Sequence, residues 1–186
     1  ATKYALSGKL TRVTLDIAEH LDDFDRNQAL VHAVSRELPA AWMPRPDLVG
    51  IGLTDADAYA RPLSTAFAYE NTWFHTEPRV DITQIDATRE NRYDFVLSSD
   101  VFEHVLPPVG RAFVNVRRML KPGGKFIFTV PFNLEPATTE HFPDLHDWSM
   151  QEIDGQWTLD NTTADGRVQR FTDLVFHGGS GSLLLK

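Results

Sequence analysis

The chain has 186 residues, of which 42% are hydrophobic and 24% are charged, a balance typical of one globular domain. Its net charge of −8 and its scattered basic residues argue against a nucleic-acid partner, because phosphate binding needs a basic surface. The absence of cysteine excludes disulfides, zinc–thiolate sites and thiol nucleophiles. The apolar runs are too short for a transmembrane helix and no signal peptide is visible, so we expect no membrane partner and a cytoplasmic location.

The first third of the chain has the pattern of two helices and one buried strand. A helix is predicted from Arg26 to Leu38, and its apolar positions share one face: Leu30, Val34 and Leu38. Several prolines then interrupt the chain before the first strand candidate, Leu48 to Leu53. A second, short helix is predicted from Ala58 to Phe67.

Three strand-like pieces follow this helix. Tyr69 to His75 is rich in aromatic and β-branched residues, and Arg79 to Ile82 is short enough to be only a strand end. Tyr93 to Ser98 has a central apolar run without alternation, which is the pattern of a strand buried on both faces.

A strand–helix–strand unit begins with that buried strand. Apolar residues recur at helical spacing from Val109 to Leu120, and Lys-Pro-Gly-Gly at Lys121 to Gly124 ends the helix. Phe126 to Val130 is a second strand with a nearly continuous apolar run. This order predicts a right-handed βαβ unit and a parallel sheet.

The last quarter of the chain has the pattern of an antiparallel meander. Trp148 to Ile153 and Gln156 to Leu159 flank Asp154-Gly155, a strong hairpin signal. A second turn at Asp165-Gly166 precedes a strand from Arg167 to Phe171. We expect a small β-meander appended to the parallel sheet.

In an open α/β sheet, ligands bind outside the carboxyl ends of the strands. Three segments of this sequence lie at such ends: Gly50 to Asp55, His75 to Asp81 and Ser98 to Asp100. These segments are the first places to look for a cofactor.

The segments Tyr93 to Val105, Arg117 to Gly124 and Phe128 to Phe132 carry a specific resemblance. They are similar to the fourth and fifth motifs of class I S-adenosylmethionine-dependent methyltransferases, and especially to the type 11-like group with Glu-His-Val and Leu-Lys-Pro-Gly-Gly. The resemblance is close from Tyr93 to Phe132 and looser from Leu48 onward. It implies a Rossmann-like, mostly parallel sheet and S-adenosyl-L-methionine as the cofactor.

The resemblance also implies roles by position. Residues of the first turn would cradle the methionine moiety: Gly50, Gly52 and Asp55. His75 or Glu77 would hold the ribose hydroxyls, and Asp81, or else Asp86, would contact the adenine. Residues ending the fourth strand would lie beneath the cofactor, beside the reacting methyl group: Ser98, Ser99 and Asp100. The chain departs from the family at the third small residue of the first motif, where it has Thr54.

The acceptor cannot be read from the sequence; we expect a small molecule or a glycan-type compound. For an oxygen or nitrogen acceptor, His104, His141 or Asp100 is a candidate base. His and Asp residues also gather between Glu140 and Asp147, but their spacing matches no tight ligand motif, so no metal site is expected.

Two other functions compete with methyl transfer. The altered first motif is compatible with a binding or scaffold domain that keeps the fold without turnover. A nicotinamide dehydrogenase would need a third glycine where this chain has Asp55, which argues against it.

We predict a single methyltransferase-like domain over residues 1–186. It would comprise an N-terminal helical segment (1–46), a cofactor-binding core (47–132) and a substrate-side extension (133–186). Too few residues follow the meander for the usual last strands, so we expect an incomplete sheet or a fragment of a longer protein. The oligomeric state is not indicated.

Overall fold

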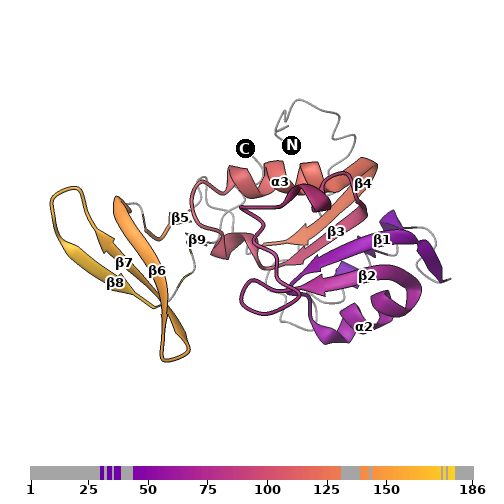
Figure 1. The fold of residues 1–186 in the computed structure, drawn as a ribbon, viewed down its shortest axis with the longest axis horizontal. Helices are drawn as coiled ribbons and strands as arrows, with labels where there is room; N and C mark the ends of the chain where they lie inside the picture. The colour runs from indigo at the N-terminus through magenta and orange to yellow at the C-terminus, as the bar shows by residue number, and fades with distance from the viewer. Residues whose placement is uncertain are drawn as a thin grey trace. The chain divides into compact units, whose positions relative to one another are not determined.

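The computed structural model describes residues 30–31, 33–34, 36–38, 44–130, 139–142, 144–172, 174 and 176–178. The chain divides into two compact units, one of residues 14–130 and one of residues 1–13 with 131–186 (Figure 1). The single-domain organisation stays a prediction. Within the described residues, no helix has the length and apolar character needed to cross a membrane.

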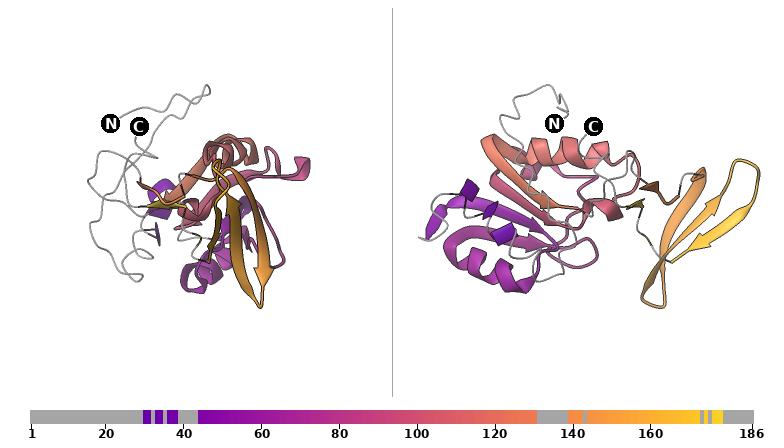
Figure 2. Two further views of the ribbon diagram at one scale, coloured as in Figure 1. Left: turned by 90° about the vertical axis from the view of Figure 1, so that its left-hand side faces the viewer. Right: turned by 180° about the vertical axis from the view of Figure 1, so that it is seen from behind.

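The unit of residues 14–130 contains a four-stranded, wholly parallel sheet in the order β2-β1-β3-β4 (Figures 1 and 2). Its strands are β1 (Arg45–Leu53), β2 (Phe67–Thr72), β3 (Tyr93–Ser99) and β4 (Leu120–Thr129). Helix α2 (Asp57–Ala66) follows β1, and helix α3 (Gly110–Met119) precedes β4. Strands β3 and β4 are adjacent and parallel, and α3 joins them. This confirms the predicted βαβ unit and the mostly parallel, Rossmann-like sheet.

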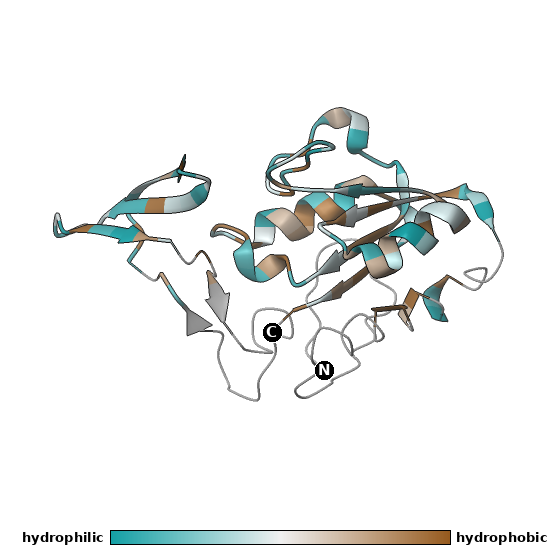
Figure 3. Ribbon diagram, turned by 90° about the horizontal axis from the view of Figure 1, so that it is seen from below, coloured by the Kyte–Doolittle hydropathy of each residue, from teal (hydrophilic) through white to brown (hydrophobic). Residues whose placement is uncertain are grey.

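The apolar pattern of each element explains its place in the sheet. Phe95, Val96 and Leu97 of β3 are fully buried, as an unbroken apolar run requires in a central strand. One core cluster joins β1 and β3 to α3, and includes Ile51, Leu53, Val96, Ala112, Val116 and Met119. A second joins α2 and the strands to the first helical residues, and includes Leu30, Val34, Leu38, Tyr59, Leu63 and Phe95. Figure 3 shows hydrophobic and hydrophilic residues alternating along the helices.

The helix predicted at the start of the chain is partly within the described residues. Backbone at 30–31, 33–34 and 36–37 is helical, and Leu30, Val34 and Leu38 are all buried together in one cluster. The three residues therefore share one face, as predicted, and this face packs against residues of α2 and of the sheet. The residues predicted to begin this helix, 26–29, lie outside the described part.

The piece from Arg79 to Ile82 makes only a minimal extension of the sheet. Arg79 forms one parallel bridge with Trp73, and the Val80 amide donates to the Trp73 carbonyl at 2.9 Å. It is a strand end rather than a strand, one of the forms that the sequence allowed. Strand β2 stops at Thr72, so His75 lies in the loop that follows it.

The Lys-Pro-Gly-Gly segment, predicted to end the helix, lies instead within β4, because α3 ends at Met119 and Leu120 already pairs with Tyr93. The pairing of β3 with β4 jumps from Tyr93–Leu120 to Phe95–Lys125, which leaves Lys121 to Gly124 out of the ladder. Gly123 has φ +82°, a conformation that suits glycine. The Lys121 ammonium pairs with Asp94 at 2.7 Å, and this contact fastens the bulge to the edge of β3.

The other unit contains the predicted meander as a separate antiparallel sheet of β6 (Asp147–Ile153), β7 (Gln156–Thr162) and β8 (Val168–Phe171). Asp154 and Gly155 both have positive φ, 50° and 79°, as a two-residue hairpin turn of type I′ requires. A two-residue pair, β5 (Thr139–Glu140) with β9 (His177–Gly178), accompanies this sheet.

Candidate cofactor site at the carboxyl edge of the sheet

The carboxyl ends of the four parallel strands lie in register. Leu53 pairs with Thr72 on β2 and with Ser98 on β3, and Ser99 pairs with Thr129 on β4. The segments that follow these strands therefore start from one edge of the sheet. This edge is where an open α/β sheet binds ligands.

Asp55, just after β1, is the centre of a buried polar cluster. Its side chain accepts hydrogen bonds from the Tyr59 hydroxyl on α2, at 2.9 Å, and from the Tyr69 hydroxyl on β2. Asn71 fixes its backbone, accepting from the Asp55 amide at 2.9 Å and donating to the Asp55 carbonyl at 2.8 Å. Asp55 is only 5% exposed, and this burial raises its pKa to about 6, although the two hydroxyls oppose the shift.

The predicted glycines, Gly50 and Gly52, lie inside β1 and face side chains of the protein itself. A Cβ on Gly50 would lie 2.6 Å from Phe95 Cε1, and one on Gly52 would lie 2.8 Å from Tyr69 Cζ and closer still to the Asp55 carboxylate. The Phe95 and Tyr69 rings stack with their centroids 6.0 Å apart. The protein therefore fills this face of β1, and the space for a cofactor must be sought at the strand's end.

Thr54 occupies the position of the third small residue of the motif and keeps a glycine-like backbone. Its φ is +59°, in the left-handed region that a β-branched residue rarely adopts. The Thr54 amide donates to the Thr72 carbonyl at 2.7 Å and so holds the turn against the end of β2. The backbone of the turn therefore has the conformation expected where the motif has a small residue, although the residue here is a threonine.

The residues at the end of β3 form the second half of the site. Ser98 is fully buried, and its hydroxyl has no hydrogen-bond partner among the described residues. The Ser99 hydroxyl lies 3.0 Å from the Thr129 hydroxyl of β4, which donates to Asp100 Oδ1 at 3.1 Å. Asp100 has φ +50°, and its amide also donates to the Thr129 carbonyl at 3.2 Å. An orphaned buried hydroxyl and a fixed carboxylate suit a polar ligand at this edge.

The candidates for the ribose and adenine contacts lie along the loop between β2 and β3. His75 is exposed, with its ring 4.8 Å from that of Phe74. Glu77 accepts from the Arg79 amide at 2.9 Å, and Asp81 accepts from the Thr83 amide and hydroxyl at 2.8 and 2.7 Å. Their roles toward a cofactor stay predictions.

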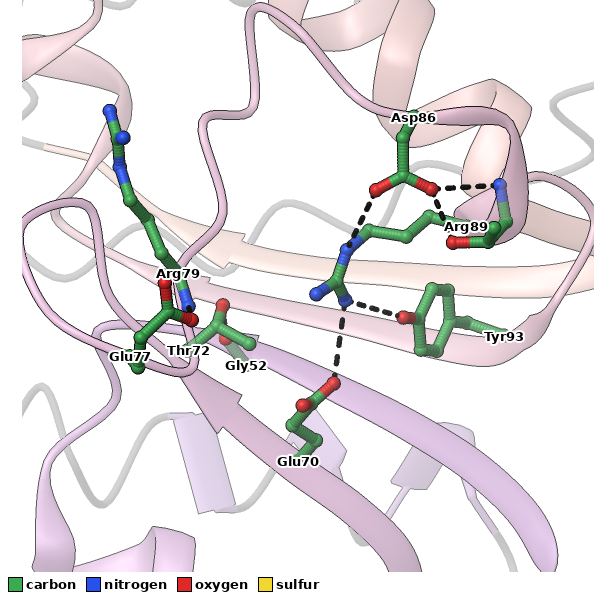
Figure 4. A network of polar contacts seen from close by, with 9 residues as sticks. Gly52, Glu70, Thr72, Glu77, Arg79, Asp86, Arg89 and Tyr93 are labelled. Atoms are coloured by element: carbon green, nitrogen blue, oxygen red, sulfur yellow. Dashed lines mark hydrogen bonds and ion pairs between the residues drawn. The ribbon is translucent and has the colours of Figure 1, made fainter.

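Asp86, the alternative to Asp81, belongs to a network around Arg89 (Figure 4). Asp86 accepts from the Thr88 amide at the start of a short 3₁₀ helix, η1 (Ala87–Arg89), and lies 3.8 Å from the Arg89 guanidinium. Arg89 also donates to the Tyr93 hydroxyl at 2.9 Å and to Glu70 at 3.4 Å. These contacts tie the loop to β2 and β3.

The two histidines proposed as bases lie in different compact units. His104 is exposed on a short 3₁₀ helix, η2 (Phe102–His104). His141 is exposed in the other compact unit, where its amide donates to the Phe176 carbonyl at 3.0 Å. Asp100 is the candidate base that the sheet holds at the site. Within the described residues, no three metal-binding side chains gather.

Sequence reasoning missed three residues of this edge: Tyr59, Tyr69 and Thr129. Tyr59 lies in the first turn of α2, four residues after Asp55, and this short separation was a local signal for their contact. Tyr69 and Thr129 reach the site only through strand pairing, which the sequence alone does not reveal.

A comparison with protein families matches residues 47–128 to the model of a methyltransferase domain. Over these residues the chain is similar to a methyltransferase domain, in keeping with the class I S-adenosylmethionine-dependent family that its sequence motifs resemble. The match contains most of β1, nearly all of β4, and the whole of α2, β2, β3 and α3. It confirms the resemblance to a methyltransferase domain, and the parallel strand order β2-β1-β3-β4 agrees with it.

Solved structures give weaker likenesses to the methyltransferase domain. A chain from the Haloferax volcanii complex of the Trm112 methyltransferase activator is 17% identical with a TM-score of 0.38, covering 61% of this chain and 62% of that one. The glycopeptide N-methyltransferase MtfA with sinefungin is 13% identical with a TM-score of 0.45 over 79% and 76% of the two chains. MtfA with S-adenosyl-L-methionine is 15% identical with a TM-score of 0.42, covering 76% of this chain and 75% of that one.

The chain thus spans less than two thirds of the first of these relatives. A comparison with curated proteins found no significant match. The strand order and the family match support the fold assignment.

Proposed function

We propose that this domain transfers a methyl group from S-adenosyl-L-methionine to an oxygen or nitrogen atom of a small-molecule or glycan-type acceptor. One observation carries the proposal: the region that matches the methyltransferase model is the region whose strand ends gather Asp55, Ser99 and Asp100 at one edge. Methyl transfer makes few chemical demands on protein groups beyond alignment of the acceptor and removal of its proton.

The residues divide into a binding part and a proton-accepting part. The turn from Leu53 to Asp55 and the buried Ser98 hydroxyl would hold the cofactor, which supplies an electrophilic methyl group when it is bound. Asp100, half-buried and held by Thr129, would accept the proton of the acceptor. His104 and His141 stay alternative bases, and a cytoplasmic location stays a prediction.

Two measurements test this function. Calorimetric titration with S-adenosyl-L-methionine should show binding to the parent protein, and incubation with a metabolite extract and methyl-labelled cofactor should label an acceptor. Asp100→Asn should slow transfer by about 100-fold while leaving the cofactor Kd within about twofold, because loss of a general base removes that order of rate. Asp57→Asn, at an exposed carboxylate of α2, is the matched control and should change neither quantity.

A second function, a scaffold domain without turnover, is favoured by the filled face of β1. Tyr69 and Asp55 occupy the space beside Gly52 that a ligand would otherwise reach. Under this function the parent protein would show no heat of binding with the cofactor and no labelled product. Binding without transfer to any acceptor in the extract would also favour it.

A further inference from the structure

Strand β6 is an exposed edge of the antiparallel sheet. Among the described residues it pairs with β7 alone, and β7 separates it from β8 (Figure 1). Six of its seven residues are exposed, and Met150, at its centre, is half-buried. The edge of a sheet presents backbone N–H and C=O groups that can pair with a further strand, and proteins usually keep such edges short. With seven residues, β6 is a long edge, whereas β8, at the opposite edge, has four.

The hairpin turn determines which residues of β6 turn their backbone groups outward. Asp154-Gly155 is a two-residue turn, so Ile153 and Gln156, which flank it, exchange hydrogen bonds with each other. Along an antiparallel strand, residues bonded to the neighbouring strand alternate with residues turned away from it. The outward backbone groups of β6 therefore belong to three residues: Trp148, Met150 and Glu152.

These three residues are complementary to a second copy of themselves. When two β6 strands lie antiparallel with Met150 opposite Met150, Trp148 of each copy lies opposite Glu152 of the other. All three outward positions then exchange hydrogen bonds across the pair. No other antiparallel register pairs all three with one another. The two three-stranded sheets would become one continuous sheet.

The side chains of the outward residues suit this register. Trp148, Met150 and Glu152 alternate with the other residues of β6 and so lie on one face of the sheet. The two Met150 thioethers would lie at the centre of that face beside both Trp148 rings, and sulfur–aromatic contacts are favourable. Trp148 is large and 37% exposed, so pairing would remove apolar surface from water. The centre of the contact is therefore apolar and its rim is acidic.

The charges of β6 are tolerated in the same register. Its two carboxylates, Asp147 and Glu152, would discourage pairing if they met each other, because like charges directly opposite are destabilising. With Met150 at the centre, Asp147 lies opposite Ile153 and Ser149 lies opposite Gln151. Glu152 lies opposite Trp148, so no carboxylate of one copy lies directly opposite a carboxylate of the other.

We propose that two copies of this chain form a dimer by antiparallel pairing of their β6 strands, centred on Met150. The two copies are related by a two-fold axis, the commonest symmetry of soluble oligomers, and each uses the same surface. The contact needs only the antiparallel sheet. It is therefore independent of the proposed function.

Sedimentation equilibrium of the full chain tests the proposal. A single strand pairing is a small interface, so we expect a micromolar Kd, with twice the monomer mass at about 100 μM and dissociation on dilution. Met150→Pro removes the central outward N–H and leaves the β7 side intact, because proline is tolerated on the open side of an edge strand. By symmetry two hydrogen bonds are lost, so association should weaken by at least about tenfold.

Val168→Pro is the matched control, because it makes the same change at the opposite edge. Val168 pairs with Thr162 of β7, and Thr162 is bonded to β6, so Val168 also turns its backbone outward. This variant should associate as the parent does. A loss of association as large as that of Met150→Pro would overturn the proposal.

A cysteine pair tests the register and covers the case in which Met150→Pro does not fold. The chain has no cysteine, so Met150→Cys introduces one thiol per copy. The two α-carbons at position 150 would lie about 5.5 Å apart, within the range of a disulfide. In Ser149→Cys the thiol residues would lie diagonally, about 7–8 Å apart, which is too far. Mild oxidation should therefore crosslink the first variant and not the second on non-reducing gels.

Three further outcomes overturn the dimer. They are a parent chain that stays monomeric at about 100 μM, about a hundred times a Kd of 1 μM, equal association of the parent and Met150→Pro, and equal crosslinking of the two cysteine variants. A monomeric chain that transfers methyl groups would reject the dimer and leave the proposed function in place. A dimeric chain without methyl transfer would do the reverse.

Discussion

The Tyr69 side chain occupies the space that a side chain at Gly52 would need: a Cβ there would lie 2.8 Å from Tyr69 Cζ and closer to its hydroxyl. Tyr69 cannot easily retreat, because its ring is stacked on Phe95 and its hydroxyl is bonded to Asp55. The glycine is therefore required by the packing of this protein, whatever else binds at the end of the strand.

Gly52→Ala should destabilise the fold by about 2 kcal/mol, because overpacking a filled core forces side chains from their positions. Urea denaturation at constant pH measures the change. Gly110→Ala is the matched control, since a Cβ at that position meets nothing within 4 Å and alanine favours a helix. Equal stabilities for the two variants would show that the Tyr69 ring moves at little cost.

Thr54→Gly should stabilise the protein by about 0.5–1 kcal/mol. Thr54 is β-branched and has φ +59°, a backbone conformation that is strained for such a residue. The free energy gained by releasing this strain exceeds the entropic cost of the more flexible unfolded chain that glycine gives. Asn91→Gly provides the comparison, because Asn91 also has positive φ, 50°, but asparagine tolerates it well. Thermal unfolding of both variants should show a higher Tm for the first alone.

Asp55 should make stability fall as the pH rises. Its pKa is 3.8 ordinarily and about 6 in the folded protein, so the folded state binds the proton more tightly than the unfolded state. The resulting stabilisation is complete below the ordinary value and is lost as the pH rises through about 6, with about 1 kcal/mol lost between about pH 5 and about pH 7.

Asp55→Asn removes this titration, so the stability difference between parent and variant should change by that amount across the same interval. Denaturant unfolding at the two pH values measures it. Asp57→Asn, at an exposed neighbour, should follow the parent at both. A constant difference between the parent and Asp55→Asn would show that Asp55 does not titrate there.

Arg89→Lys should cost about 1 kcal/mol of stability. Arg89 is only 17% exposed and binds Glu70, Tyr93 and Asp86 at once, and a lysine cannot reproduce this fork of donors. Arg61→Lys, in an exposed pair with Asp57, should stay within about 0.5 kcal/mol of the parent. Chemical denaturation compares the two, and a loss at Arg61 as large as at Arg89 would contradict the expectation.

The sequence was sufficient to predict the parallel core, because the patterns that indicate its strands and helix are local in the chain. The unbroken apolar run of β3 predicts burial on both faces, and the spacing of Ala112, Val116 and Met119 predicts the helix that covers one of them. The Asp154-Gly155 turn likewise predicted the β6–β7 hairpin, because few residue pairs adopt positive φ in succession.

The site was determined only in part by the sequence. Asp55, Ser99 and Asp100 were predicted because they follow strands, and all parallel strands end at one edge. The sequence could not show that Tyr69 fills the space beside Gly52, or that Thr129 connects Ser99 to Asp100. Those contacts depend on which strands are neighbours and in what register, and residues far apart in the chain meet only when the tertiary structure brings their strands together.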